Sequence, residues 1–183
     1  MTPLFSRRQL ILGSVAGFFI PALITTQKTS AAAAHFFPSV SGKNLNGKSF
    51  SFPQNFTAQR TLILFAYQRE QADDLASWVE GLALTQKSIP WFEMPIISTP
   101  YKIGSFFIDR GMRSGIPDEK IRDRVVTIYT DQEAFSKALG IQFEKTAAYA
   151  LVVDGHGKIV GFEKGAYNLR KASIILRHLK ISK

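Results

Sequence analysis

The stretch that most constrains the fold of this chain is TLILFAY, at positions 61–67. It is continuously apolar after its first residue and is bounded by polar residues, which is typical of a strand buried on both faces of a sheet. The following stretch, 71–84, has apolar residues at the spacing of one helix face and predicts an amphipathic helix. These residues are Leu75, Val79, Leu82 and Ala83. A buried strand that leads directly into a helix indicates an α/β domain.

The remaining patterns continue this order. An Asn46-Gly47 dipeptide within 36–56 predicts a hairpin, and glycines with Pro117 in 101–124 predict short helices and loops rather than sheet. Further strands are expected at 91–97, 125–129, 149–153 and 158–162, and further helices at 132–139 and 168–181. The predicted fold is one mixed sheet flanked by helices, with an N-terminal hairpin and an irregular helical insertion.

The chain contains no cysteine among its 183 residues. Thiolate chemistry, disulfides and thiolate metal sites are therefore excluded. The three histidines, His35, His156 and His178, show no metal-ligand spacing, so the sequence predicts no metal site and no cofactor.

The N-terminal segment has the features of an export signal. Ser6-Arg7-Arg8-Gln9-Leu10-Ile11 resembles a twin-arginine motif, an apolar stretch covers 10–24, and small residues at 30–34 resemble a signal-peptidase site. We expect residues 1–34 to be a signal peptide, 35–183 to be a single domain, and the protein to be periplasmic in a bacterial-type cell. The alternative is an uncleaved anchor in the inner membrane, although the apolar stretch is shorter than the ~20 residues of a span.

The whole chain has a net charge of +9, and without the signal residues Arg7, Arg8 and Lys28 the charge is about +6, which suits an acidic partner or weak contact with an anionic lipid surface. No nucleic-acid-binding pattern is present, so a nucleic-acid partner is not expected. From residue 164 onward the sequence has no acidic residue, and its basic residues there are Lys164, Arg170, Lys171, Arg177, Lys180 and Lys183.

The order of elements, with the stretches LNGKSFSFP, TLILFAY and ALVVDGHGKIVGFEKG, resembles the thioredoxin-like superfamily over residues 36–181, nearest its peroxiredoxin and TlpA-type branch. The resemblance places Glu70 and Asp73 at the positions of the two active-site cysteines, and Ala148 near the position of a cis-proline. Disulfide exchange and peroxide reduction both need a sulfur nucleophile. The redox mechanism of that superfamily is therefore excluded here.

The C-terminal half, from SGIPDEKIRDRVV to GFEKGAYN, resembles the mitochondrial assembly factor of the ATP synthase membrane sector, a thioredoxin-like family of chaperone-like binders. Together with the expected export signal, the two resemblances imply an exported, non-redox protein that binds a protein or peptide, including a membrane-associated one, and that has no catalytic residue. The expected groove has a rim formed by 69–73, 101–113 and 146–149. The candidate binding residues are Arg69, Glu70, Asp73, Tyr101, Arg110, Arg113 and Ala148.

An alternative is a non-thiol enzyme or small-anion-binding protein that uses Glu70 or Asp73 together with Arg113. The two carboxylates also have a simpler explanation, because acidic residues in the first turn of a helix are stabilised by the helix dipole. An enzyme requires polar groups that converge in a pocket, whereas a partner-binding module exposes an apolar surface.

Overall fold

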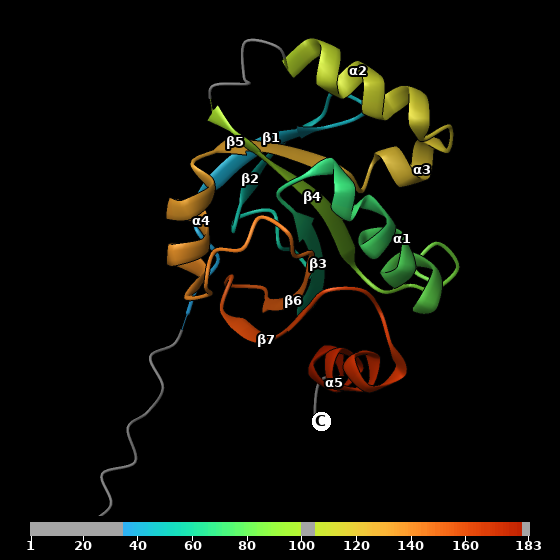
Figure 1. Ribbon diagram of the computed structural model, residues 1–183. Helices are drawn as coiled ribbons and strands as arrows, with labels where there is room; N and C mark the ends of the chain where they lie inside the picture. The colour runs from blue at the N-terminus through green and yellow to red at the C-terminus, as the bar shows by residue number, and fades with distance from the viewer. Residues whose placement is uncertain (1–34, 100–104, 181–183) are drawn as a thin grey trace, which may run out of the picture. The chain divides into compact units, whose positions relative to one another are not determined.

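The computed structural model describes residues 35–99 and 105–180, which form a seven-stranded mixed sheet (Figure 1). The strand order is β2-β1-β5-β4-β3-β6-β7. The three central strands β5, β4 and β3 are parallel to one another, and the remaining pairs are antiparallel. The strands are β1 Val40–Asn44, β2 Ser49–Phe52, β3 Arg60–Ala66, β4 Trp91–Ser98, β5 Val126–Thr130, β6 Tyr149–Asp154 and β7 Ile159–Lys164.

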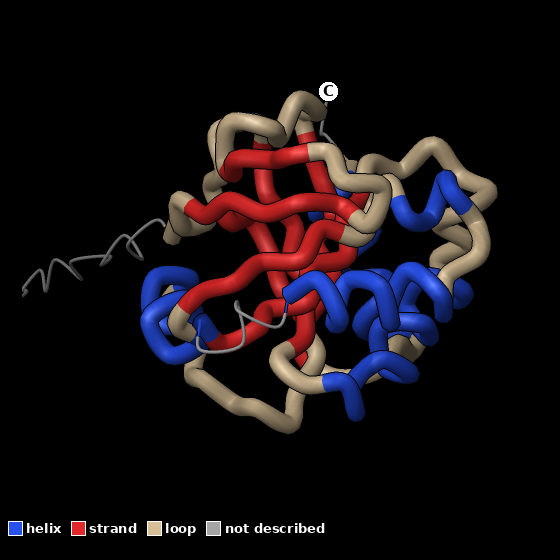
Figure 2. Tube along the Cα trace, turned by 90° about the horizontal axis from the view of Figure 1, so that it is seen from above, coloured by secondary structure: helices blue, strands red, loops and turns tan. Residues whose placement is uncertain are grey.

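Helices lie on both sides of the sheet, as Figure 2 shows. The short 3-10 helix η1, Arg69–Gln71, leads from β3 into α1. The α-helices are α1 Ala72–Gly81, α2 Ser105–Gly115, α3 Glu119–Arg122, α4 Gln132–Leu139 and α5 Leu169–Leu179.

The sheet separates two apolar cores, because successive side chains of a strand point to opposite faces. On one face, Ile63 and Phe65 of β3 belong to the same buried cluster as Phe135 of α4. On the other face, Leu62 and Leu64 of β3 are clustered with residues from α1 and α5, including Trp78 and Ile175. The uninterrupted apolar character of 61–67 follows from this double coverage, and the predicted fold class is confirmed.

The N-terminal hairpin is formed by β1 and β2, and its turn is tied to α3. Gly47 has a φ of +88°, a conformation that favours glycine. The Asn46 side chain donates to the Asp123 carboxylate at 2.7 Å and accepts from Arg122 Nε at 3.0 Å. The turn predicted at Asn46-Gly47 is therefore part of the contact between the hairpin and the insertion.

Two helices differ from the sequence prediction. The helix expected at 71–84 ends at Gly81, because Ala83 takes a φ of +52° and Leu84 N donates to the Val79 carbonyl at 2.9 Å in the turn that follows. In the insertion, α2 is a continuous helix of 11 residues that runs through Gly111, where short helices and loops are expected. A helical glycine costs only about 1 kcal/mol relative to alanine, so it does not by itself end a helix.

Candidate functional site

A cavity of about 600 Å³ lies beside the carboxyl ends of β3 and β4, between the sheet, α1 and α2. We call it the α1–α2 cavity. Its volume falls within the ~300–1,000 Å³ of typical ligand pockets. The apolar part of its lining comes from all three walls and includes Ala72, Leu75, Ile97, Ile108, Met112 and Ile116.

Two charged side chains, Arg69 and Glu93, also line the α1–α2 cavity. Arg69 lies in η1 at the exposed end of the cavity. Glu93 lies within β4, in register with Leu64 of β3, and its backbone N–H donates to the Arg124 carbonyl at 2.9 Å. Because side chains alternate along a strand, Glu93 points to the same face of the sheet as Trp91.

The Glu93 carboxyl has no hydrogen-bonding or ion-pairing partner within residues 35–99 and 105–180. Burial raises the pKa of Glu93 to about 7, since the charged form loses solvation that no neighbouring group replaces. An unpaired carboxyl in an apolar surrounding is energetically unfavourable, and native proteins rarely retain one without a partner. Glu93 is therefore the residue of this cavity that most strongly indicates a ligand.

The edge of the sheet at the cavity is held by buried polar side chains. Gln132 of α4 donates to the carbonyl of Tyr67 at 3.1 Å and to that of Ile96 at 2.7 Å, which joins the ends of β3 and β4. The Tyr67 hydroxyl is hydrogen-bonded to that of Ser136, and burial raises the pKa of Tyr67 to about 12. In η1, Gln71 accepts from the backbone N–H of Gln68 at 2.9 Å. These contacts fix the cavity wall before any ligand arrives.

The predicted rim residue Arg69 lies at the α1–α2 cavity, whereas Glu70 and Asp73 do not line it. Both carboxylates are exposed at the start of α1. Tyr101 lies outside the described residues. Ala148 is fully buried in the core below α1 and α5, and its carbonyl accepts from Gly165 N at 2.7 Å, so it is not available at a groove surface.

Arg110 and Arg113 line a different pocket, of about 590 Å³, between α2 and the β1–β2 hairpin. Lys43 and Arg122 contribute to the same pocket, together with the carboxylate of Asp109. The face of α2 that carries Ile108 and Met112 therefore borders the α1–α2 cavity, and a second face carries its arginines. The structure does not bring Arg113 together with Glu70 or Asp73 in either pocket.

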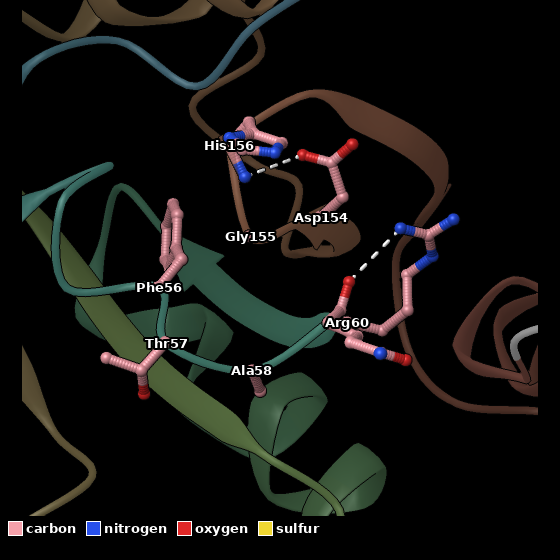
Figure 3. Close-up of a pocket in the computed structure, with 8 residues that line it drawn as sticks. Phe56, Thr57, Ala58, Arg60, Asp154, Gly155 and His156 are labelled. Carbon is pink, nitrogen blue, oxygen red and sulfur yellow. Dashed lines mark hydrogen bonds between the residues drawn. The ribbon is translucent and has the colours of Figure 1, made fainter.

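A third, shallower pocket of about 420 Å³ lies near the beginning of β3 (Figure 3). Its lining includes Asp154 and His156, but the Asp154 carboxylate accepts from the backbone N–H groups of His156 and Lys158, both at 2.9 Å. Arg60 donates to the carbonyl of Gln59 at 3.1 Å. Asp154 thus organises the turn between β6 and β7, and the pocket shows no acid–base pair.

Sequence reasoning missed Glu93 and Gln132. The signal for Glu93 is present in the stretch WFEMPII, where a single carboxylate interrupts a run of apolar residues. A buried charged residue is more informative than a buried apolar one, because it needs a compensating partner. Gln132 gives no comparable signal, since a glutamine in the first turn of a helix is usually solvated.

Neither a metal cluster nor a membrane-spanning helix is found in the part of the chain that the structure describes. No group of three metal-ligating side chains lies close enough together there to hold an ion. None of the helices in the same residues is both long and apolar enough to cross a bilayer.

No protein-family model matches the chain, and no curated protein sequence matches it. Solved structures do match. BsSco, a member of the Sco family of cytochrome c oxidase assembly proteins, is 14% identical, with a TM-score of 0.57 over 80% of this chain and 92% of BsSco. The exposed lipoprotein thioredoxin of Streptococcus pneumoniae strain TIGR4 is also 14% identical, with a TM-score of 0.50 over 78% of this chain and 98% of its own.

At these identities the likeness establishes the fold alone. The chain is an α/β protein of thioredoxin-like fold, as the sequence resemblance predicts. It differs from a thiol oxidoreductase in having no cysteine, and it carries an apolar cavity beside the start of α1.

Proposed function

We propose that this chain is an exported, non-redox thioredoxin-like protein that binds a segment of a protein partner in the α1–α2 cavity and acts as an assembly factor. The observation that carries the proposal is the cavity itself. It opens beside the turn that joins β3 to α1, where the thioredoxin-like resemblance puts the thiols of redox relatives. In this chain the same region offers apolar walls and no sulfur nucleophile.

The composition of the walls favours a protein segment over a small polar metabolite. Leu75 from α1, Ile97 from β4 and Met112 from α2 contribute apolar surface from three elements. Apolar side chains that enter such a site gain roughly 25 cal/mol per Å² of buried surface. Methionine, with three rotatable bonds, adapts to side chains of different shape and is common at surfaces that bind protein segments.

The assembly role is supported by two likenesses of different kinds. BsSco belongs to a family of cytochrome c oxidase assembly proteins. The second likeness is the resemblance that we infer from the sequence alone, between the C-terminal half of this chain and an ATP synthase assembly factor. The export signal expected at 1–34 lies outside the described residues, and it would put the domain in the periplasm. In that compartment the exposed Arg170 and Arg177 of α5 can also contact anionic lipid.

The alternative that uses Glu70 or Asp73 with Arg113 on a small anion has no comparable support. The two carboxylates are exposed and lie outside the described pockets, while Arg113 lines the pocket beside the hairpin. General acid–base chemistry requires the reacting groups to lie within hydrogen-bonding reach of one substrate. We therefore retain the binding function.

Photo-cross-linking from inside the cavity tests this proposal. A photoreactive amino acid replaces Met112 in the full chain, and the cells are irradiated before the envelope proteins are separated. We expect a discrete adduct with a protein partner. Adding Ile97→Asp, which places a charge on the cavity wall, should abolish that adduct.

The matched control carries the same photoreactive amino acid at Arg177, which is exposed on α5 and does not line the cavity. Melting temperatures establish that each variant is folded. Adducts of equal yield from both positions, or an adduct that is insensitive to Ile97→Asp, would contradict binding in the α1–α2 cavity.

A further inference from the structure

The arrangement around Glu93 restricts what the α1–α2 cavity can bind. Its carboxyl lies on the sheet side of a cavity whose other walls are mainly apolar, and it has no partner atom among the described residues. Along β4 the neighbouring cavity residues Pro95 and Ile97 are apolar. A ligand that fills this space with apolar groups alone would remove the remaining water from the carboxyl and leave it unsatisfied, at a large cost in free energy.

The described residues around the cavity supply little compensation for the Glu93 charge. Arg69 is the single cationic residue that lines the described cavity, and it is exposed and forms no ion pair with Glu93. The Tyr67 hydroxyl is already bonded to Ser136. From α2, the residues that border the cavity are Ile108, Gly111, Met112 and Gly115, none of which carries a charge.

We infer that the bound segment carries a lysine or arginine side chain whose cationic group pairs with the Glu93 carboxylate inside the α1–α2 cavity. This inference rests on the proposed function, and it specifies the chemistry of the partner. A lysine or arginine has an aliphatic stem that can lie against the apolar walls while its head group reaches the carboxylate. The same ligand therefore satisfies both the apolar walls and the half-buried carboxylate of Glu93.

The inference requires a particular pH dependence. With its pKa near 7, Glu93 is mostly neutral at pH 6 and mostly ionised at pH 8. A cationic ligand binds the ionised form, so affinity should increase by about tenfold from pH 6 to pH 8. Among the described residues that line the cavity, Glu93 and Tyr67 are the two acids, and burial raises the pKa of Tyr67 to about 12, far outside this range. A ligand that accepts a hydrogen bond from the neutral acid would show the opposite trend.

The experiment is a selection of random displayed peptides on the purified full chain, with a second selection on Ile97→Asp to remove peptides that bind elsewhere. We expect the cavity-dependent peptides to share a lysine or arginine flanked by apolar residues. Each such peptide is then synthesised with the basic residue and with norleucine in its place. Affinities for the original chain, for Glu93→Gln and for the control Glu80→Gln complete a double-mutant cycle. Glu80 is exposed on α1 and outside the cavity.

The basic peptide should bind Glu93→Gln at least about tenfold more weakly at pH 8, and the norleucine peptide should bind both forms equally. Glu80→Gln should bind like the original chain. Cavity-dependent peptides without a basic residue, or with equal affinity for Glu93→Gln, would overturn the inference and leave the proposed function intact. Recovery of no cavity-dependent peptide from a folded chain would overturn both.

Discussion

The Glu93 carboxyl affects the folding stability of the free protein as well as the binding of a ligand. Its pKa is near 7 in the folded state and near 4.5 when the carboxyl is solvated, as in the unfolded chain. Between these two pH values the folded state keeps a proton that the unfolded state releases. The contribution of Glu93 to the free energy of unfolding should therefore fall as the pH rises from about 4.5 to 7 and change little above that range.

Replacing Glu93 with glutamine removes this penalty, because the amide has no charge to desolvate. We expect Glu93→Gln to raise the free energy of unfolding at pH 8 by about 2–3 kcal/mol more than it does at pH 5. Urea unfolding at the two pH values measures the difference, and Glu80→Gln is the exposed control. An effect of Glu93→Gln that is the same at both pH values would show that the carboxyl is well solvated.

Glu70 and Asp73 differ from Glu93 in their exposure to solvent, since both are exposed near the start of α1. Carboxylates near a helix N-terminus contribute about 0.3–1 kcal/mol each through the helix dipole. The double variant Glu70→Gln, Asp73→Asn should lower stability by about 0.6–2 kcal/mol and leave complementation of a deletion strain intact. Loss of complementation at normal abundance and melting temperature would favour the enzyme alternative.

Among the elements, α4 holds the cavity edge of the sheet through a single side chain. Gln132 satisfies the carbonyls at the ends of β3 and β4, and it is buried with only 9% of its surface exposed. Gln132→Leu keeps a similar size but leaves both carbonyls without this donor. We expect it to lower the free energy of unfolding by about 1–3 kcal/mol.

Hydrogen exchange locates the effect of that substitution. Protection should fall at the ends of β3 and β4 more than in β7, which does not contact Gln132. The matched control is Lys137→Gln, an exposed position on the same helix. A uniform loss of protection across all strands would indicate a general destabilisation instead of a local role at the cavity edge.

The elements themselves could largely be predicted from local sequence. The apolar run at 61–67 predicts a buried strand, and β3 lies there. The Asn46-Gly47 dipeptide predicts a tight turn, and the β1–β2 hairpin has its turn at that position. The extent of α2 could not be predicted, because Gly111 lowers the local helix propensity. The apolar residues Ile108 and Met112, which lie on one face of α2 and border the cavity, favour the helix instead.

The candidate site was less accessible to sequence reasoning than the fold. Arg69 lines the α1–α2 cavity, whereas Arg110 and Arg113 line the pocket beside the hairpin and Glu70 is exposed outside the described pockets. The assignment of a residue to one or another face of α2 depends on where α2 lies relative to β4 and to the β1–β2 hairpin, whose residues line the two pockets. No local sequence pattern specifies that placement.

For the whole molecule, the absence of cysteine and the predicted export signal both bear on the hypothesis that this chain is an exported, non-redox binding protein. Disulfides form in oxidising compartments outside the cytoplasm. This chain has no thiol with which it could form or exchange a disulfide there. A function that depends on binding alone is compatible with such a compartment. The hypothesis therefore requires that the chain is in fact delivered there.

Twin-arginine signals generally do not function when both arginines are replaced, even by lysine, which preserves the positive charge. Arg7→Lys together with Arg8→Lys should therefore retain the precursor in the cytoplasm. Fractionation followed by mass spectrometry measures both delivery and processing, and the exported form of the unmodified chain should begin near residue 35. Lys28→Arg, a conservative change outside the motif, should be exported normally. Unchanged delivery of the double variant would instead indicate the general secretory route, and an exported form that retains residues 1–34 would indicate the uncleaved anchor.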